Sequence, residues 1–288
     1  VDMTILVTGG NGQLGRAMRL ASAESRHRYI FTDIEELNIV SAEAIEAFFT
    51  REAIDVVVNC AAYTAVDLAE EEAPIADSIN HRAVALLAEA CKRHNATLIH
   101  ISTDYIFDGK AATPYTEEST PAPINAYGRT KWAGEQALAE SGCRAIILRT
   151  QWLYSEYGRN FCKTMLSLFT SRNEVRVVAD QMGTPTYAGD LAEAICDIIE
   201  GDKGDKCGTY HYSNLGECSW YDFAAEIAKV SGCNSCKITP CTTADYPTKA
   251  TRPQYSVLDK SKFMATFNID IPEWRESLAK CIKRLNNR

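Results

Sequence analysis

The sequence predicts an α/β protein in which a doubly wound parallel sheet carries helices on both faces. Short apolar segments alternate with amphipathic ones from Thr4 to about Thr150, in the order expected of strands and helices. The apolar segments are continuously hydrophobic, which is typical of parallel strands buried on both faces. At 288 residues the chain is long enough for one large α/β unit or two coupled domains.

Five strands are predicted in this first half: Thr4–Thr8, Tyr29–Asp33, Asp55–Ala62, Thr97–Ser102 and Arg144–Arg149. Between them the pattern predicts helices at Gln13–Ala23, Ser41–Phe49 and Ser78–His94, and a further helix that contains Tyr127 and ends at Gly142. Ser41 can cap its helix because a serine hydroxyl accepts a backbone N–H of the first turn. Gly142 can take the left-handed conformation in which helices often end.

The second half alternates less regularly. It predicts helices at Asn160–Phe169, Leu191–Glu200 and Ser219–Ser231, short strands at Val175–Val178 and Lys237–Pro240, and an irregular loop at Asp245–Tyr255. We therefore predict a smaller α/β domain interleaved with the sheet domain, with a cleft between them. The sheet domain is expected to take residues 1–150 with about 188–205 and 254–262, and the smaller domain residues 151–187, 206–253 and 263–288.

Charge and hydropathy exclude several classes of protein. A net charge of −8 and the lack of any Lys/Arg block argue against nucleic-acid binding. No apolar run approaches the roughly 20 residues that span a bilayer, and we see no signal-peptide pattern. Most of the eleven cysteines lie in apolar periodic segments, as expected of thiols in a reducing cytosol. We expect a cytoplasmic protein with no membrane partner.

The cysteines at Cys233, Cys236 and Cys241 are the exception, because they form a C-x-x-C pair with a third thiol nearby. A zinc site needs a fourth ligand, and no second pair of Cys or His follows. We interpret these thiols as structural and keep a metal site as the minor alternative.

A glycine-rich turn, Gly9-Gly10-Asn11-Gly12-Gln13-Leu14-Gly15, joins the first strand to the first helix. Glycines at Gly9, Gly12 and Gly15 let the backbone turn tightly and approach a pyrophosphate, and a helix N-terminus supplies N–H donors. We predict a Rossmann-like dinucleotide site that includes Gln13 and Leu14. The sheet domain is then the dinucleotide-binding domain.

An acid and a run of small residues extend this site. Asp33 follows Gly15 by 18 residues and ends the second strand, where a carboxylate can bind the ribose hydroxyls of the cofactor. Such an acid repels a 2′-phosphate and slightly favours NADH, but Arg16 near the turn leaves NADPH open. The third strand ends in Cys60-Ala61-Ala62, whose small side chains leave room for a cofactor ribose.

Three further residues suggest the chemistry. Tyr127 and Lys131 are four positions apart on a predicted helix, so they share one face. Thr103 follows Ser102 at the end of the fourth strand, where its hydroxyl can donate to a substrate carbonyl. A tyrosine can protonate the same oxygen, and we expect Lys131 and the positive nicotinamide ring of the oxidised cofactor to lower the tyrosine pKa toward neutrality. Together with the glycine-rich turn, Thr103, Tyr127 and Lys131 predict a nicotinamide-dependent oxidoreductase, and we expect Tyr127 and Lys131 to bind the cofactor as well.

The chain is identified as a member of the extended short-chain dehydrogenases/reductases and resembles the dTDP-4-dehydrorhamnose reductase family. The similar strings are Asn59–Glu70, Ser102–Gly109, Arg149–Tyr154, Asn160–Leu166, Asp180–Thr186 and Arg252–Asp259, in this order. The resemblance implies reduction of the C4 ketone of dTDP-4-dehydro-β-L-rhamnose. It also implies Thr103, Tyr127 and Lys131 as the catalytic set, and it places substrate-binding residues at Val66, Thr103, Asp104, Trp152, Asn160, Lys163 and Arg252.

Within this resemblance, Trp152 is expected to pack near the sugar ring, and Arg252 to pair with the diphosphate, which suits its planar fork. Asn160 and Lys163 are expected to face the nucleotide. One departure concerns metal. Some members bridge a dimer through Mg²⁺ held by glutamates, one of them at the position of Ala17, and residues 280–288 carry no acid. We therefore expect neither a metal nor a metal-bridged dimer, and the oligomeric state is open.

Two other functions are considered. Another nucleotide-sugar reductase or epimerase would share the cofactor site but differ in the smaller domain. The regulatory subunit of methionine adenosyltransferase resembles this family and acts as a binding partner. The complete set of Thr103, Tyr127 and Lys131 favours catalysis over that second reading.

Overall fold

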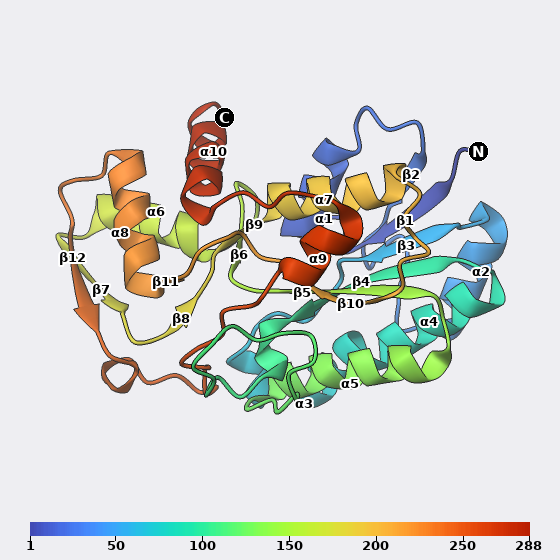
Figure 1. Cartoon of the computed structure of the whole chain (residues 1–288), viewed down its shortest axis with the longest axis horizontal. Coiled ribbons are helices and arrows are strands. Elements are labelled where there is room, and N and C mark those ends of the chain that lie inside the picture. Colours follow the sequence, from blue (N-terminus) through green and yellow to red (C-terminus); the bar gives the residue numbers. More distant parts are fainter.

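The computed structural model describes residues 1–288 and contains a central sheet of six strands, all parallel (Figure 1). Across the sheet the strands are β2 (Arg28–Phe31), β1 (Thr4–Thr8), β3 (Val56–Asn59), β4 (Thr97–Thr103), β5 (Ala145–Thr150) and β10 (Gly208–His211). The strand order reverses between β1 and β3. In doubly wound sheets the ligand binds outside the carboxyl ends of the strands at such a point.

Helices cover both faces of the sheet, as predicted. One face carries α1 (Gln13–Ala21), α7 (Ala188–Glu200) and α9 (Ser261–Phe267), and the other carries α2 (Ala42–Glu52), α4 (Ala83–Arg93) and α5 (Ala126–Ser141). Neighbouring strand residues point to opposite faces. Ile5 and Val7 therefore pack against the α1 layer, whereas Leu6 packs against the α4 layer. The predicted fold class is confirmed.

A second, smaller unit lies beside the sheet and has a hydrophobic core of its own (Figure 1). Its helices are α6 (Phe161–Ser171), α8 (Trp220–Ser231) and α10 (Trp274–Asn286). Its strands form three short pairs: β7 (Glu174–Val178) with β12 (Lys237–Cys241), β8 (Met182–Gly183) with β11 (Cys218–Ser219), and β6 (Leu153–Tyr154) with β9 (Thr186–Tyr187). None of the helices in either unit combines the length and the apolar character needed to cross a membrane.

Several elements of the second half were not predicted: the two-residue strands β6, β8, β9 and β11, the strand β10, and the helices α9 and α10. The strand β10 completes the central sheet, although its residues fall in the range 206–253 that we had assigned to the smaller domain. Phe263 and Phe267 of α9 pack into the core under the sheet, although they too had been assigned to the smaller domain. We now propose that the sheet unit also takes residues 206–212 and 263–271.

The predicted helix Ser78–His94 is the end of a longer one. It begins at α3 (Ala73–Asp77), widens into the π-helical segment η2 (Ser78–Arg82) and continues as α4. The widened turn directs the buried Asn80 side chain to Tyr63, where it accepts from the N–H at 2.8 Å, and to the Thr130 hydroxyl on α5 at 3.1 Å. Wide turns of this kind are frequent at functional sites. This one ties the segment after β3 to the helix that carries Tyr127.

Candidate active site

The glycine-rich turn has the close contacts that a dinucleotide site requires. A Cβ atom at Gly9 would lie 2.6 Å from the Ala61 nitrogen, and one at Gly15 would lie 2.3 Å from the Gly9 oxygen. Gly9 also has a φ of +62°. Gly12 precedes α1 and offers no side-chain cap, so the first N–H groups of the helix are free to bind an anion. The turn therefore fits a bound pyrophosphate.

The carboxylate of Asp33 lies beside this turn, as predicted. It follows β2, and its Oδ2 accepts a hydrogen bond from the Asn11 N–H at 3.1 Å. Its Oδ1 accepts from the Ile34 N–H at 2.9 Å. Both contacts hold the carboxylate just after β2. This strand lies next to β1, which leads into the glycine-rich turn, and a cofactor ribose would lie here.

The Gln13 side chain connects the turn to the smaller unit, a role that the sequence did not indicate. Its Oε1 accepts from the Ser155 hydroxyl at 2.8 Å and from Asn160 Nδ2 at 3.1 Å. Asn160 also caps α6, since its Oδ1 accepts from the Lys163 N–H at 3.1 Å. Asn160 therefore joins the first residue of α1 to the first turn of α6, and both hydrogen-bonding atoms of its amide are occupied.

Thr103, Tyr127 and Lys131 come together at the carboxyl end of β4. Thr103 is the last residue of that strand, and its hydroxyl is near enough to the Tyr127 phenol to lower the pKa of that phenol. Lys131 is one turn further along α5, with 2% of its surface exposed, and its Nζ donates to the Ile101 oxygen at 2.6 Å. The Tyr127 ring packs edge-on against Tyr105 with the centroids 5.7 Å apart. The set that was predicted as catalytic thus forms one cluster.

The ionisation of this cluster differs from the expectation. Burial raises the pKa of Tyr127 to about 12, and the Thr103 hydroxyl opposes this only in part. Burial also lowers the pKa of Lys131 to about 8. The predicted fall of the phenol pKa toward neutrality is therefore not present in this structure, because desolvation dominates. The phenol is protonated at neutral pH, which is the form that a general acid requires.

A cavity of about 1090 Å³ opens between the smaller unit and the segment after β3. Among the residues predicted to bind substrate, Asn160 and Arg252 line it, together with Tyr105 next to Thr103. Trp152 does not line the cavity. Its ring stacks on Trp220 with the centroids 3.6 Å apart, and it is Trp220 that faces the space. Trp152 therefore packs against Trp220, which forms part of the cavity wall.

The guanidinium of Arg252 is already paired. Its Nη1 and Nη2 donate to the two carboxylate oxygens of Asp67 at 2.8 and 3.0 Å. Arg252 holds the pKa of Asp67 below its ordinary value. The N–H of Ala250 also donates to Asp67. Asp67 therefore connects the loop that contains Ala250 and Arg252 to the segment after β3. Arg252 lines the cavity, and its predicted contact with a diphosphate stays a prediction; a diphosphate bound there would share Arg252 with Asp67.

The other two residues predicted to face the substrate show different surroundings. Lys163 is half-buried on α6 and forms no ion pair. Val66 is half-buried in the segment that follows β3 and leads into η1 (Leu68–Glu70). Neither residue lines the cavity. Their predicted roles stay predictions.

Asp104 is buried directly beneath the catalytic hydroxyls. It is 2% exposed, and its Oδ1 accepts from the Thr103 hydroxyl at 3.2 Å. Burial raises its pKa from an ordinary 3.8 to about 7. The folded protein therefore binds one more proton than the unfolded chain between about pH 4 and pH 7. Stability falls as the pH rises through this range and stays lower above it.

We expect Asp104→Asn to stabilise the fold at pH 8, by up to about 4 kcal/mol, because asparagine pays no cost of burying a charge. The gain should be smaller at pH 5, where the folded-state carboxyl is still protonated. Thermal unfolding of both proteins at the two pH values measures the effect. Asp205→Asn, at an exposed position, is the matched control. A gain that does not change with pH would contradict the assignment.

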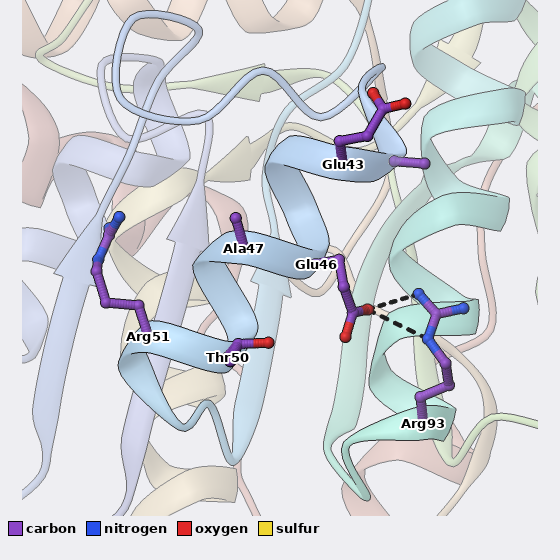
Figure 2. A pocket seen from close by; sticks show the side chains of 7 residues that line it. Glu43, Glu46, Ala47, Thr50, Arg51 and Arg93 are labelled. Carbon is purple, nitrogen blue, oxygen red and sulfur yellow. Dashed lines mark hydrogen bonds and ion pairs between the residues drawn. The ribbon is translucent and has the colours of Figure 1, made fainter.

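The cysteines and the surface hollows add no second site. All eleven thiols are free, and no group of three or more His, Cys, Asp or Glu side chains is arranged to hold a metal ion. A hollow of about 650 Å³ lies on the outer side of α2 and α4, where Glu46 accepts two hydrogen bonds from Arg93 (Figure 2). It contains none of the residues predicted for the site.

Comparison with known proteins places the chain in a family. The family model described as "RmlD substrate binding domain" matches residues 3–287. The chain belongs to this family, that of the dTDP-4-dehydrorhamnose reductases. A dTDP-4-dehydrorhamnose reductase of Aggregatibacter actinomycetemcomitans is 41% identical over 95% of this chain and 96% of its own length. The predicted membership is confirmed, and the protein is an oxidoreductase.

Solved structures of family members have the same fold. A dTDP-4-dehydrorhamnose reductase from Clostridium acetobutylicum is 43% identical, with a TM-score of 0.95 over 99% of this chain and 100% of that one. The corresponding enzyme of Bacillus anthracis, in complex with NADP, is 36% identical, with a TM-score of 0.94 over 99% and 100% of the two chains. These members support a nicotinamide cofactor for the family.

Proposed function

We propose that the protein reduces the C4 ketone of dTDP-4-dehydro-β-L-rhamnose to dTDP-L-rhamnose, with Tyr127 as the proton donor. The observation that carries the proposal is that Thr103, Tyr127 and Lys131 come together at the carboxyl end of β4. The same chain has a turn that fits a dinucleotide and a cavity large enough for a nucleotide sugar, lined by Tyr105 beside this cluster. The named activity of the family members supports the choice of substrate.

Each residue of the site has a distinct role in the proposed reaction. The turn at Gly9, Gly12 and Gly15 would hold NADH or NADPH, which supplies the hydride. Thr103 donates a hydrogen bond to the ketone oxygen, and Tyr127 delivers its proton to that oxygen as it gains charge. Lys131 keeps a positive charge beside the phenolate that remains. None of these steps requires a metal ion. We therefore predict that activity does not depend on added metal.

Turnover is the direct test. Purified protein should oxidise NADH or NADPH when the 4-keto sugar nucleotide is added. No oxidation with either cofactor would contradict the proposal and favour a binding role. A different dTDP-linked 4-ketone is kept as a second candidate substrate. A Streptomyces antibioticus relative, 39% identical over 96% of this chain, is named "Probable dTDP-4,6-dihydroxy-2-methyloxan-3-one 4-ketoreductase". The ratio of kcat/KM for the two ketones decides between them.

We expect wild-type protein to favour NADH slightly and Asp33→Ala to lower the NADH:NADPH ratio of kcat/KM about tenfold or more. The carboxylate beside Asn11 would accept from the ribose hydroxyls and repel a 2′-phosphate. Glu35→Gln, which neutralises an exposed acid nearby, should leave the ratio unchanged. A wild-type protein with a higher kcat/KM for NADPH than for NADH would contradict this prediction.

We expect Arg252→Ala to raise KM for the sugar nucleotide about tenfold or more and to change kcat little, because a diphosphate contact is made equally in ground and transition states. Asp67→Asn separates two explanations. If Arg252 binds the diphosphate, this variant keeps KM near or below the wild-type value, since it weakens the competing ion pair. If KM rises equally in both variants, Arg252 acts only by holding its loop to Asp67.

A further inference from the structure

The helix α5 carries a third buried polar residue on the face of Tyr127 and Lys131. Glu135 follows Lys131 by four positions, so the three side chains lie one above the other. Glu135 is 3% exposed and accepts a hydrogen bond from the Ser102 hydroxyl. Lys131 binds the oxygen of Ile101, and Tyr127 lies near Thr103. Two consecutive residues of β4, Ile101 and Ser102, are thus bonded to this helix face, and Thr103 follows them beside Tyr127.

Glu135 is fixed in place by Arg149 from the neighbouring strand. Arg149 is 4% exposed, and its Nε lies 2.9 Å from Glu135 Oε1 while its Nη2 lies 2.7 Å from Oε2. It is also the register partner of Ser102 across β4 and β5. A buried ion pair is costly to build and more costly to break. The ion pair of Glu135 and Arg149 is therefore buried beside Ser102, the residue before Thr103.

Glu135 is the strongest influence that keeps a charge on Lys131. Burial lowers the pKa of Lys131 to about 8, and the Glu135 carboxylate opposes this more than any other group. The Cys60 thiol, after β3, has a smaller effect in the same direction. The other titratable groups facing this region are His100 of β4, Asp104 after β4, Tyr127 of α5, Arg149 of β5 and His211 of β10.

Most of these other groups are neutral or paired at neutral pH. Burial lowers the pKa of His211 to about 3 and that of His100 well below its ordinary value, so both imidazoles are uncharged. Arg149 keeps its positive charge in the pair with Glu135, but it is not among the groups that shift the pKa of Lys131. Burial raises the pKa of Tyr127 to about 12, so the phenol is protonated. Glu135 is thus the full negative charge nearest to Lys131 on its own helix face.

We propose that Glu135, held by Arg149, is a positioning residue that keeps Lys131 charged and holds Tyr127 in register with Thr103. The carboxylate does this from the buried side of α5 and touches neither substrate nor cofactor. The proposal rests on the function proposed above, in which a charged Lys131 supports proton transfer from Tyr127.

The test compares pH profiles of Glu135→Gln with those of wild type. Loss of the carboxylate lowers the pKa of Lys131, so the alkaline limb of kcat/KM should move to lower pH by about one unit or more. Glu140→Gln makes the same chemical change at an exposed position of the same helix and should leave the limb in place. Glu135→Asp keeps the charge and should keep most of the wild-type profile.

A structural role alone gives a different result. It would lower the melting temperature of Glu135→Gln and leave the alkaline limb where it is, which would overturn the proposal. A limb that moves equally in Glu135→Asp and Glu135→Gln would also overturn it. If Glu135→Gln does not fold, the double variant Glu135→Gln/Arg149→Gln removes both members of the ion pair and should still move the limb to lower pH.

A measurement without sugar nucleotide separates this proposal from the proposed function. NADH affinity is measured against pH in wild type, Glu135→Gln and Glu140→Gln. A neutral Lys131 should weaken NADH binding, so the affinity of Glu135→Gln should fall at lower pH than that of the two other proteins. If wild type shows no turnover but this difference appears, the substrate was misassigned and the role of Glu135 stands. If affinity follows the same pH dependence in all three proteins, the role of Glu135 is wrong.

Discussion

Tyr127→Phe is expected to lower kcat by about 10²–10⁴-fold, because it removes the proton donor from the ketone oxygen. The phenol lies near the Thr103 hydroxyl, its ring packs against Tyr105, and its raised pKa keeps it protonated at neutral pH. Phenylalanine fills the same space, so the fold and the glycine-rich turn stay intact. Steady-state kinetics and NADH titration of the purified variant measure both effects.

Tyr105→Phe is the matched control for this prediction. It makes the same change in the neighbouring ring, which lies against Tyr127, and it keeps the backbone N–H of residue 105 that donates to the Thr103 hydroxyl. We expect it to retain far more turnover than Tyr127→Phe. If Tyr127→Phe keeps activity within about threefold of wild type, general acid catalysis by this residue is excluded.

Gly128→Ala is expected to reduce kcat about a hundredfold and to destabilise the fold by about 1–3 kcal/mol. The added Cβ would lie 2.1 Å from the Tyr105 oxygen and 3.2 Å from Asn125 Oδ1. Neither neighbour can yield easily, since Tyr105 is in the turn after β4 and Asn125 caps α5. The start of α5 must therefore move, and it carries the adjacent Tyr127 away from Thr103.

A Gly→Ala change where space is available provides the comparison. At Gly204 the nearest side-chain atom would be 3.7 Å from the new Cβ, which is an ordinary contact. Gly204→Ala should therefore leave kcat and thermal unfolding close to wild type. Full activity of Gly128→Ala would show that α5 can shift without moving the phenol, and would contradict the tight register described here.

Much of the sheet could be predicted because its signal is local. Runs such as Val56–Val58 are continuously apolar, and Ser41 and Gly142 mark helix ends with their own chemistry. The strand β10 gave no such signal, since it combines Gly208 with a terminal histidine and belongs to the sheet only through its pairing with β5. Its assignment depends on a contact between distant segments.

The candidate site likewise contains residues that local spacing predicts and residues that only long-range contacts bring together. Spacing within one turn or one helix located Gly9, Gly15, Tyr127 and Lys131, because these positions are fixed by local geometry. The pairing of Arg252 with Asp67 and the stacking of Trp152 on Trp220 bring together residues far apart in the chain. The pKa of Tyr127 likewise depends on how many segments bury it. No periodicity in the sequence reports such quantities.

The interleaved path of the chain has a consequence for recombination between relatives. A hybrid made by joining residues 1–150 of one protein to the remainder of another would combine two sources within one sheet, because β10 pairs with β5 and α7 packs over β1 and β3. Substrate preference cannot be transplanted as a single C-terminal block without replacing that shared core. A workable chimera exchanges residues 151–187, 213–253 and 272–288 as separate inserts, because α10 shares the core of the smaller unit, and it leaves α7, β10 and α9 with their native sheet.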